Sequence, residues 1–185
     1  MLETLKQYDT ELFLFLNNLH TSFFDEVFVV ATQRFTWIPF YAMLLFFAWK
    51  KYGNSVWKYL IAIALLIICA DQLSVFIKNY VQRYRPCHNL TLQNIVHLVN
   101  GECGGQFGFI SSHATNSMAL TVFTYLTIFS KNRLMMGIMI FYTLFVSYSR
   151  IYLGMHYPLD IVCGFFVGTL VGHGVFLFSK NNKLV

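Results

Sequence analysis

The chain alternates long apolar stretches with short polar connections. Six stretches read as membrane helices, and they cover residues 23–33, 37–49, 58–81, 112–130, 134–149 and 157–178. A bilayer crossing takes about 20 mainly apolar residues, so the first of these is short or tilted. Residues 2–20 instead mix polar and apolar positions at helical spacing, which predicts an amphipathic helix at the membrane surface. The pattern therefore predicts an all-α, polytopic bundle of six transmembrane helices preceded by an interfacial helix.

The same pattern predicts how the chain is divided. We expect an interfacial helix over residues 1–20, a six-helix membrane domain over residues 21–180 and a short tail over residues 181–185. Residues 82–111 form the only sizeable predicted loop. The N-terminus lacks the pattern of a cleaved signal peptide.

Composition agrees with a membrane protein. Of 185 residues 57% are hydrophobic and only 11% are charged, whereas a soluble domain carries about 25% charged residues. The net charge of +5 does not indicate a nucleic-acid partner, because the positions of the basic residues explain it better. One side of the predicted bundle collects Lys6, Lys50, Lys51, Lys58, Lys131, Arg133, Lys180 and Lys183. The other side collects Arg34, Lys78, Arg83, Arg85 and Arg150. The first side is predicted to be cytoplasmic.

Four of the five outer cations lie in or beside three polar segments. These segments are Lys78–Pro86 (KNYVQRYRP), Ser111–His113 (SSH) and Ser149–Asp160 (SRIYLGMHYPLD). Ionisable groups beside spanning segments are costly and are therefore functional candidates. Several Arg and Lys side chains together with two histidines favour a phosphate ligand.

The spacing within the segments gives each residue a role. Lys78 and Arg85 are seven residues apart, and Arg150 approaches from another helix. Ser111 and the backbone N–H groups of Ser112 and His113 open a helix, whose N-terminus favours an anion. His156 and Asp160 are four residues apart, so the carboxylate could orient the imidazole as a nucleophile. His113 is then available as the general acid.

These segments resemble the three signature motifs of the type-2 phosphatidic acid phosphatase superfamily, K-x6-R-P, P-S-G-H and S-R-x5-H-x3-D. The resemblance covers about residues 57–178. It implies that His156 forms a phosphohistidine, that Asp160 orients it and that His113 is the acid. It also implies that the phosphoryl oxygens are held by Lys78, Arg85, Ser111, Arg150 and the amide of Ser112. Family members of this kind act on lipids without a metal or another cofactor, on a six-helix core.

The second motif departs from the family pattern. Ile110-Ser111-Ser112-His113 stands where the family has Pro-Ser-Gly-His, so Ser112 replaces a glycine. If the glycine is needed only for its N–H, a serine supplies the same group. If it is needed for a positive φ, the serine would be strained. We favour the first interpretation.

Other polar residues are interpreted more simply. Arg83 lies outside the matched positions and is interpreted as a solvated loop cation, and Asp71 receives no catalytic role. The histidines have no compact metal-ligand spacing, so no metal is expected.

The cysteines and glycines bear on packing. Cys69 and Cys163 are expected to pack within helices, and Cys87 and Cys103 to form a disulfide across the outer loop. The glycines at positions 164, 168 and 172 permit close helix contact, either internally or at a homodimer seam.

The sequence therefore predicts a membrane lipid phosphatase that acts at the outer leaflet, in a bacterial inner membrane with its site facing the periplasm or exterior. The small outer loop favours a simple substrate, undecaprenyl diphosphate, as the first choice. Phosphatidylglycerophosphate, phosphatidic acid and lipid A phosphate remain alternatives. A protein that binds or moves lipid phosphates without turnover is an alternative of another class.

Overall fold

The computed structural model describes residues 2–33 and 35–185, and the named secondary-structure elements of these residues are all helices. The α-helices are α1 (Leu2–Asn17), α2 (Ser22–Thr32), α3 (Ile38–Tyr52), α4 (Val56–Val81), α5 (Ser112–Thr127), α6 (Arg133–Tyr152) and α7 (Pro158–Asn181). Two short 3₁₀ helices, Gly53–Ser55 and Pro86–His88, join them. The predicted all-α class is confirmed. Arg34, counted above among the outer cations, lies outside the described residues.

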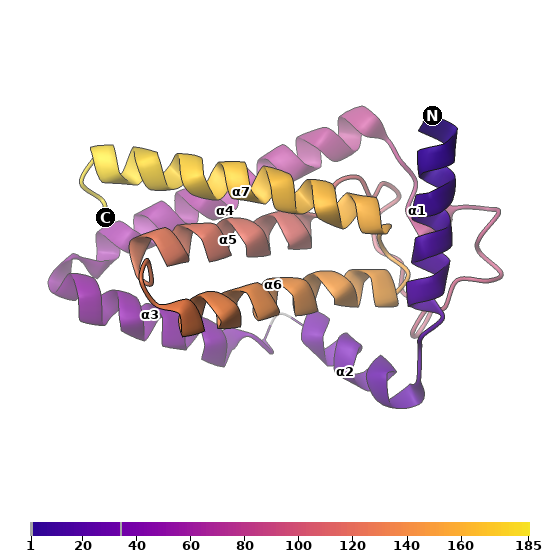
Figure 1. Ribbon diagram of the computed structural model, residues 1–185, viewed down its shortest axis with the longest axis horizontal. Coiled ribbons are helices and arrows are strands. Elements are labelled where there is room, and N and C mark those ends of the chain that lie inside the picture. Colours follow the sequence, from indigo (N-terminus) through magenta and orange to yellow (C-terminus); the bar gives the residue numbers. More distant parts are fainter. Residues whose placement is uncertain (1, 34) are drawn as a thin grey trace.

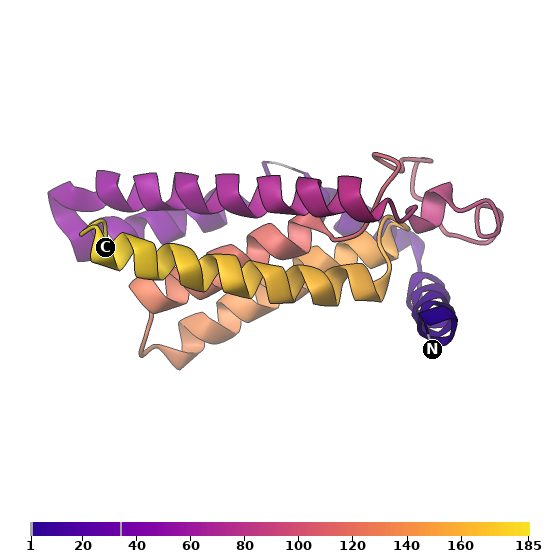
Figure 2. The ribbon, with the colours of Figure 1, turned by 90° about the horizontal axis from the view of Figure 1, so that it is seen from above.

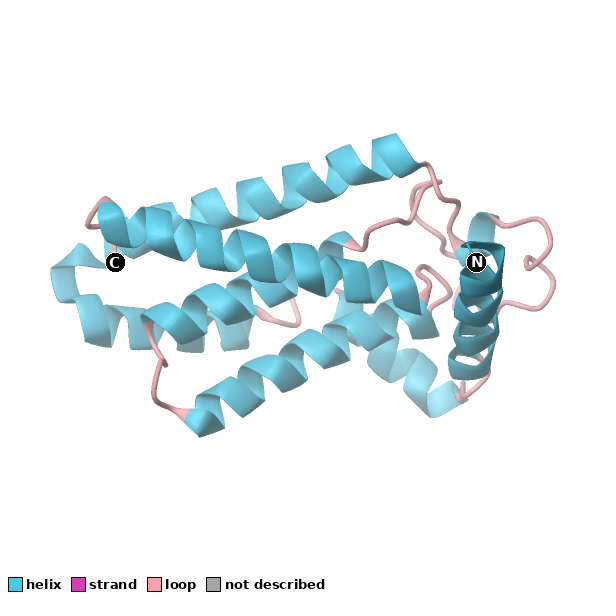
Figure 3. Ribbon diagram, turned by 45° about the horizontal axis from the view of Figure 1, so that its top comes forward, coloured by secondary structure: helices cyan, strands magenta, loops and turns pink. Residues whose placement is uncertain are grey.

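Helices α3 to α7 run side by side, and α1 lies across one end of this bundle (Figure 1; Figure 2). The long loop between α4 and α5 lies at the same end (Figure 3). The three polar segments belong to the end of α4, the start of α5 and the connection from α6 to α7. The fold therefore brings all three to one end of the bundle, beside α1. Lys6 belongs to α1 and so lies at this end as well, and our expectation that it lies with the basic residues of the opposite side was wrong.

A seam of glycines joins α5 to α7, the helix pair with the most extensive contacts. A Cβ on Gly164 would lie 3.0 Å from the carbonyl oxygen of Ser111, and one on Gly172 would lie 2.7 Å from that of Ala119. A Cβ on Gly168 would meet the carbonyl of Thr115 more closely still. The glycine stripe is therefore internal packing, and it does not provide a homodimer seam.

Three helical stretches are long and apolar enough to cross a membrane within the described ranges. They are Ile38–Val81, which includes the 3₁₀ break, Arg133–Tyr152 and Pro158–Asn181, with mean hydropathies of 2.5, 1.5 and 2.1. Helix α2 has only 11 residues and spans about 16 Å, about half of the hydrocarbon core. Helix α5 has 16 residues. The count of six crossings therefore stays a prediction.

Helix α1 ends three residues earlier than predicted, at Asn17. One of its faces is buried against the bundle at Asp9, Phe13 and Asn17. The Asn17 amide donates to the carbonyl of Tyr152 at 2.7 Å and accepts from the N–H of His97 at 2.8 Å. Leu5, Tyr8, Leu12, Phe15 and Leu19 form an exposed apolar set beside this face. The structure thus shows that one face of α1 packs against the bundle. The position of α1 at a bilayer surface stays a prediction.

Candidate functional site

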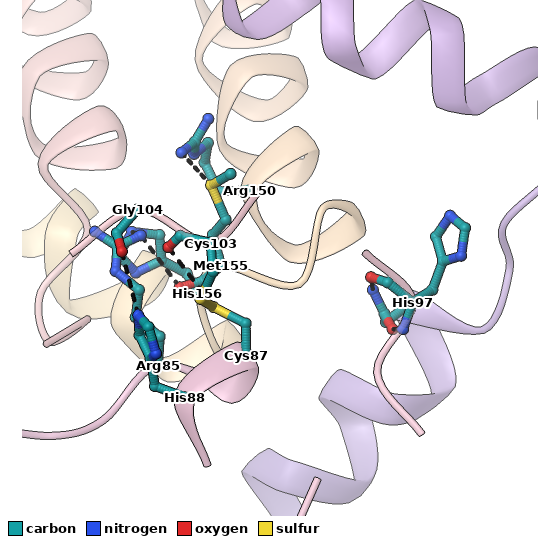
Figure 4. Close-up of a disulfide and its surroundings, with 10 residues drawn as sticks. Arg85, Cys87, His88, His97, Cys103, Gly104, Arg150, Met155 and His156 are labelled. Carbon is teal, nitrogen blue, oxygen red and sulfur yellow. Dashed lines mark hydrogen bonds between the residues drawn. A yellow bond between two sulfur atoms is a disulfide. The ribbon is translucent and has the colours of Figure 1, made fainter. Parts of the chain in front are cut away.

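The two arms of the loop at residues 82–111 pair with each other and fix the position of Arg85. The N–H of Arg85 donates to the carbonyl of Gln106 at 3.1 Å, and the N–H of Gly108 donates to that of Arg83 at 2.8 Å. Further out, Cys87 and Cys103 are joined in a disulfide with a Cα–Cα distance of 5.9 Å (Figure 4). The predicted disulfide is thus present in the structure. It closes the arms two residues beyond Arg85.

His156 lies between a carboxylate and a guanidinium. Its Nδ1 is 3.3 Å from Oδ2 of Asp160, and its Nε2 is 3.3 Å from Nη1 of Arg85. Figure 4 shows Arg85 and His156 pointing toward one another. Because the carboxylate accepts at Nδ1, the ring proton belongs there and the Nε2 lone pair faces the cations. Only 1% of His156 is exposed.

The surroundings keep this imidazole neutral. Burial lowers the pKa of His156 well below its ordinary value, and the charges of Arg85, Arg150 and Lys78 lower it further. The N–H of His156 donates to the carbonyl of Arg150 at 3.1 Å. Hydrogen bonds therefore fix both the main chain and the imidazole ring of His156.

The cations line the space around Nε2. Lys78 donates to the hydroxyl of Ser112, and the guanidinium of Arg150 contacts the sulfur of Met155. The buried Nε atoms of Arg85 and Arg150 have no hydrogen-bond partner among the described residues. Buried donors without partners are rare and call for an acceptor. A tetrahedral oxyanion would supply several.

The start of α5 contributes the second predicted segment. The hydroxyl of Ser111 accepts from the N–H of Ala114 at 3.5 Å, and the N–H of Ser111 donates to the carbonyl of Asp160 at 3.1 Å. Ser112 is the first residue of the helix, and it is not among the described residues other than glycine that have a positive φ. Its hydroxyl also lies 2.6 Å from that of Ser74. The serine that replaces the family glycine is therefore accommodated without backbone strain.

His113 opens onto a cavity of about 590 Å³ between α3, α4, α5 and α6. It lies near enough to Arg150 and His156 to be influenced by their charges. The cavity runs from Ser112 and His113 toward Tyr59 and Leu60, near the opposite end of α4, and most of its lining is apolar. The structure thus brings all the predicted site residues to one end of the bundle, with an apolar cavity beginning at His113.

Arg83 is not the solvated loop cation that we expected. Its side chain is 21% exposed and bridges two carboxylates, donating to Asp160 Oδ1 at 2.9 Å and to Asp9 Oδ2 at 2.6 Å. The guanidinium also lies 3.9 Å from the centre of the Tyr157 ring. The other oxygen of Asp9 accepts from the N–H of Leu159 at 2.8 Å. Sequence patterns could not predict this bridge, because Arg83 and Asp9 are 74 residues apart.

Gly108 is a second residue that the sequence analysis missed. A Cβ there would lie 3.2 Å from Oδ2 of Asp160 and 3.5 Å from Nδ1 of His156. Both contacts fall on the pair of atoms that orients the imidazole. A larger residue at this position would crowd that pair.

The described residues contain one group that could hold a metal ion, formed by Cys87, His88 and Cys103. Both sulfur atoms are committed to the disulfide, so neither can act as a thiolate ligand. These residues do not fit a metal while the disulfide is intact.

Three known proteins are similar to this chain over most of its length. Lipid A 4'-phosphatase of Bacteroides thetaiotaomicron is 40% identical over 184 residues, covering 96% of this chain and 78% of that protein. The enzyme of the same name from Porphyromonas gingivalis is 34% identical, covering 99% and 79%. Undecaprenyl-diphosphatase BcrC of Bacillus subtilis is 24% identical, covering 86% and 77%.

Two solved structures share the fold. Aquifex aeolicus LpxE superposes with a TM-score of 0.67 at 24% identity, covering 90% of this chain and 93% of that one. The PAP2-type phosphatidylglycerolphosphate phosphatase of Bacillus subtilis superposes with a TM-score of 0.74 at 19% identity, covering 96% and 87%.

The model of the PAP2 superfamily matches residues 55–184. This range contains all three polar segments and the four helices that carry them. The chain therefore belongs to the PAP2 superfamily and is an integral-membrane lipid phosphatase.

Proposed function

We propose that this phosphatase removes the 4'-phosphate from lipid A. The observation that carries the proposal is the pair of lipid A 4'-phosphatases that are 40% and 34% identical over nearly the whole chain. The cavity that begins at His113 supports it, because its apolar lining suits acyl chains. Lipid A was one of the alternatives from the sequence, and it now replaces undecaprenyl diphosphate as the first choice.

In the proposed reaction the 4'-phosphate binds among Lys78, Arg85, Arg150 and the start of α5. Nε2 of His156 attacks phosphorus and forms a P–N bond, while the bond from phosphorus to the sugar oxygen breaks. His113 donates a proton to that departing oxygen. Asp160 stabilises the positive charge that develops on the imidazole.

Water completes the cycle. His113, now deprotonated, accepts a proton from the attacking water, and the P–N bond breaks to release inorganic phosphate. His156 returns to its neutral form. Every proton step uses residues of this chain.

We place the site on the outer face of a bacterial inner membrane. The bias of Lys and Arg toward the opposite end supports this orientation. The disulfide also supports it, since disulfides persist in oxidising compartments.

Undecaprenyl diphosphate is the second candidate, because BcrC is 24% identical over 86% of the chain. Phosphate release from lipid A, undecaprenyl diphosphate, phosphatidylglycerophosphate and phosphatidic acid by the purified protein separates the candidates. We expect the highest kcat/KM with lipid A and trapping of ³²P-labelled phosphoenzyme on protein quenched in alkaline denaturant, because a P–N bond is stable in base and labile in acid. His156→Ala should abolish both signals. Turnover that survives this substitution contradicts the mechanism, and binding without turnover on any lipid favours a non-catalytic protein.

A further inference from the structure

The wall of the cavity just beyond His113 carries two polar acceptors that the proposed reaction leaves unused. They are the carboxylate of Asp71 on α4 and the side-chain carbonyl of Asn116 on α5. Asn116 lies three residues after His113, and so one helical turn deeper. Asp71 lies one turn before Ser74, whose hydroxyl contacts that of Ser112. Both acceptors therefore lie on the side of His113 that leads into the cavity.

Neither acceptor has a hydrogen-bond partner in the described part of the chain. Oδ1 of Asn116 is buried and has no hydrogen-bond partner among the described residues. Within residues 2–33 and 35–185 no side chain forms a hydrogen bond or an ion pair with the Asp71 carboxylate. Lys78, two turns away on α4, already donates to Ser112. The charges of Asp71 and Lys78 attract each other, but a carboxylate at membrane depth that accepts no hydrogen bond is costly, which makes it a candidate for ligand contact.

From this arrangement we propose that Asp71 and Asn116 form a leaving-group subsite for a neutral alcohol that carries hydroxyl or amide N–H donors. The proposal rests on the proposed function and names the chemistry that this site selects. The phosphate lies among the cations, so the departing oxygen lies toward His113 and the rest of the substrate extends toward the two acceptors. An acylated amino sugar supplies hydroxyl and amide donors at that place.

The charge of the leaving group distinguishes sugar phosphates from prenyl diphosphates. When a prenyl diphosphate loses its terminal phosphate, the leaving group is itself an anionic monophosphate. That anion would depart toward the Asp71 carboxylate, where a like charge disfavours it. The leaving group of a sugar phosphate takes one proton from His113 and is neutral. The subsite therefore favours phosphate esters of donor-bearing sugars over lipid diphosphates.

Two substitutions should shift this preference in opposite directions. Asp71→Asn removes the charge at nearly constant shape, and Asn116→Asp adds a second one. With lipid A we expect Asp71→Asn to lower kcat/KM about tenfold, the order expected for losing a hydrogen bond to a charged acceptor. With undecaprenyl diphosphate it should leave kcat/KM unchanged or raise it. Asn116→Asp should raise the ratio of lipid A to diphosphate activity. Gln72→Asn, on the neighbouring exposed position outside the cavity lining, is the matched control and should leave the ratio unchanged.

A binding measurement tests the subsite without turnover. Trp37 lines the same cavity, so its fluorescence can follow titration with the fully dephosphorylated lipid A disaccharide in micelles. Wild type should bind this probe about tenfold more tightly than Asp71→Asn. Equal affinities, or equal changes of kcat/KM with both substrates, overturn the inference while leaving the proposed function standing. Tight probe binding that needs Asp71 in a protein that hydrolyses no lipid phosphate would overturn the proposed function alone.

Discussion

Arg83 donates a 2.9 Å hydrogen bond to Oδ1 of Asp160, leaving Oδ2 to face His156 at 3.3 Å. The two oxygens of this carboxylate thus have separate partners. The other end of the guanidinium is held by Asp9 on α1 at 2.6 Å. The helix across the end of the bundle is therefore bonded, through one arginine, to the residue that orients the proposed nucleophile.

We predict that Arg83→Gln lowers kcat about 10- to 100-fold with little change in KM. The carboxylate loses one of the two donors that fix its rotation, the other being the N–H of Tyr157, and a misplaced reacting group costs up to about 100-fold. Arg83→Lys should recover part of the loss, since one ammonium keeps the charge but cannot bridge both carboxylates. Asp9→Asn should show a smaller effect of the same kind. Steady-state phosphate release measures both constants.

Glu3→Gln is the matched control for Asp9→Asn. It removes an exposed ion pair with Lys6 on the same helix, and exposed pairs contribute little. A KM effect without a kcat effect at Arg83 would contradict a positioning role.

Gly168→Ala should destabilise the protein by about 1–3 kcal/mol, the usual effect of overpacking. The added methyl group would press on the main chain of α5 at Thr115. Gly174→Ala on the same helix has no atom within 4 Å of the new Cβ, and it should be neutral or stabilising by up to about 1 kcal/mol. Unfolding in detergent compares the two variants. Equal changes in the free energy of unfolding for the two variants would show that α5 and α7 are not in close contact at Gly168.

Removing the disulfide by Cys87→Ser with Cys103→Ser should lower the free energy of unfolding by about 3 kcal/mol. KM should rise as well, because Arg85 lies two residues from the bridge. Cys69→Ser, at a free cysteine, is the control. Alkylation of the denatured, unreduced wild type should label only Cys69 and Cys163. Labelling of all four cysteines would show that the bridge is absent.

Stability should fall as the pH drops below about 6.5, the pKa of an unfolded histidine. The folded protein holds the pKa of His156 well below that value, so below pH 6.5 the unfolded chain binds a proton that the folded chain does not. The loss contributed by His156 is at most about 1.4 kcal/mol per pH unit. The melting temperature at pH 7.5 and 5.5 measures it. His156→Asn should reduce this dependence, and the exposed His173→Gln should not.

Ser112→Gly should fold normally and keep kcat/KM within about threefold of wild type. The backbone N–H that the family glycine offers is already present in Ser112, and its φ needs no glycine. Lys78 loses the hydroxyl it contacts but keeps its place on α4. A loss of more than tenfold would show that the hydroxyl itself has become necessary.

The sequence was sufficient to predict which residues meet at one end of the bundle, because these residues lie in short segments at helix ends. His156 and Asp160 are one turn apart, and the fold needed only to bring the ends of α4, α5 and α6 together. Contacts between segments that are far apart in the sequence could not be predicted. Nothing near Arg83 indicates Asp9, and nothing near Gly108 indicates that it packs on His156.

Helix ends were also only partly predictable. The helix expected over residues 37–49 runs on to Tyr52, and the one expected over residues 112–130 already ends at Thr127. The glycine stripe had two interpretations, because a surface of small residues fits an internal helix as well as a partner chain. The positions of Thr115 and Ala119 on α5 decided between them.

Substitutions in the glycine seam between α5 and α7 would disturb a close main-chain contact, whereas substitutions in the cavity wall would not. His113 lies on one helix of that pair and Asp160 on the other, so contact between two main chains sets the spacing of two groups that act in the proposed reaction. The opposite wall of the cavity is made by side chains of α3 and α4. Descendants of this protein can therefore acquire new lipid preferences through substitutions in that wall, while inheriting the same phosphoryl-transfer geometry unaltered.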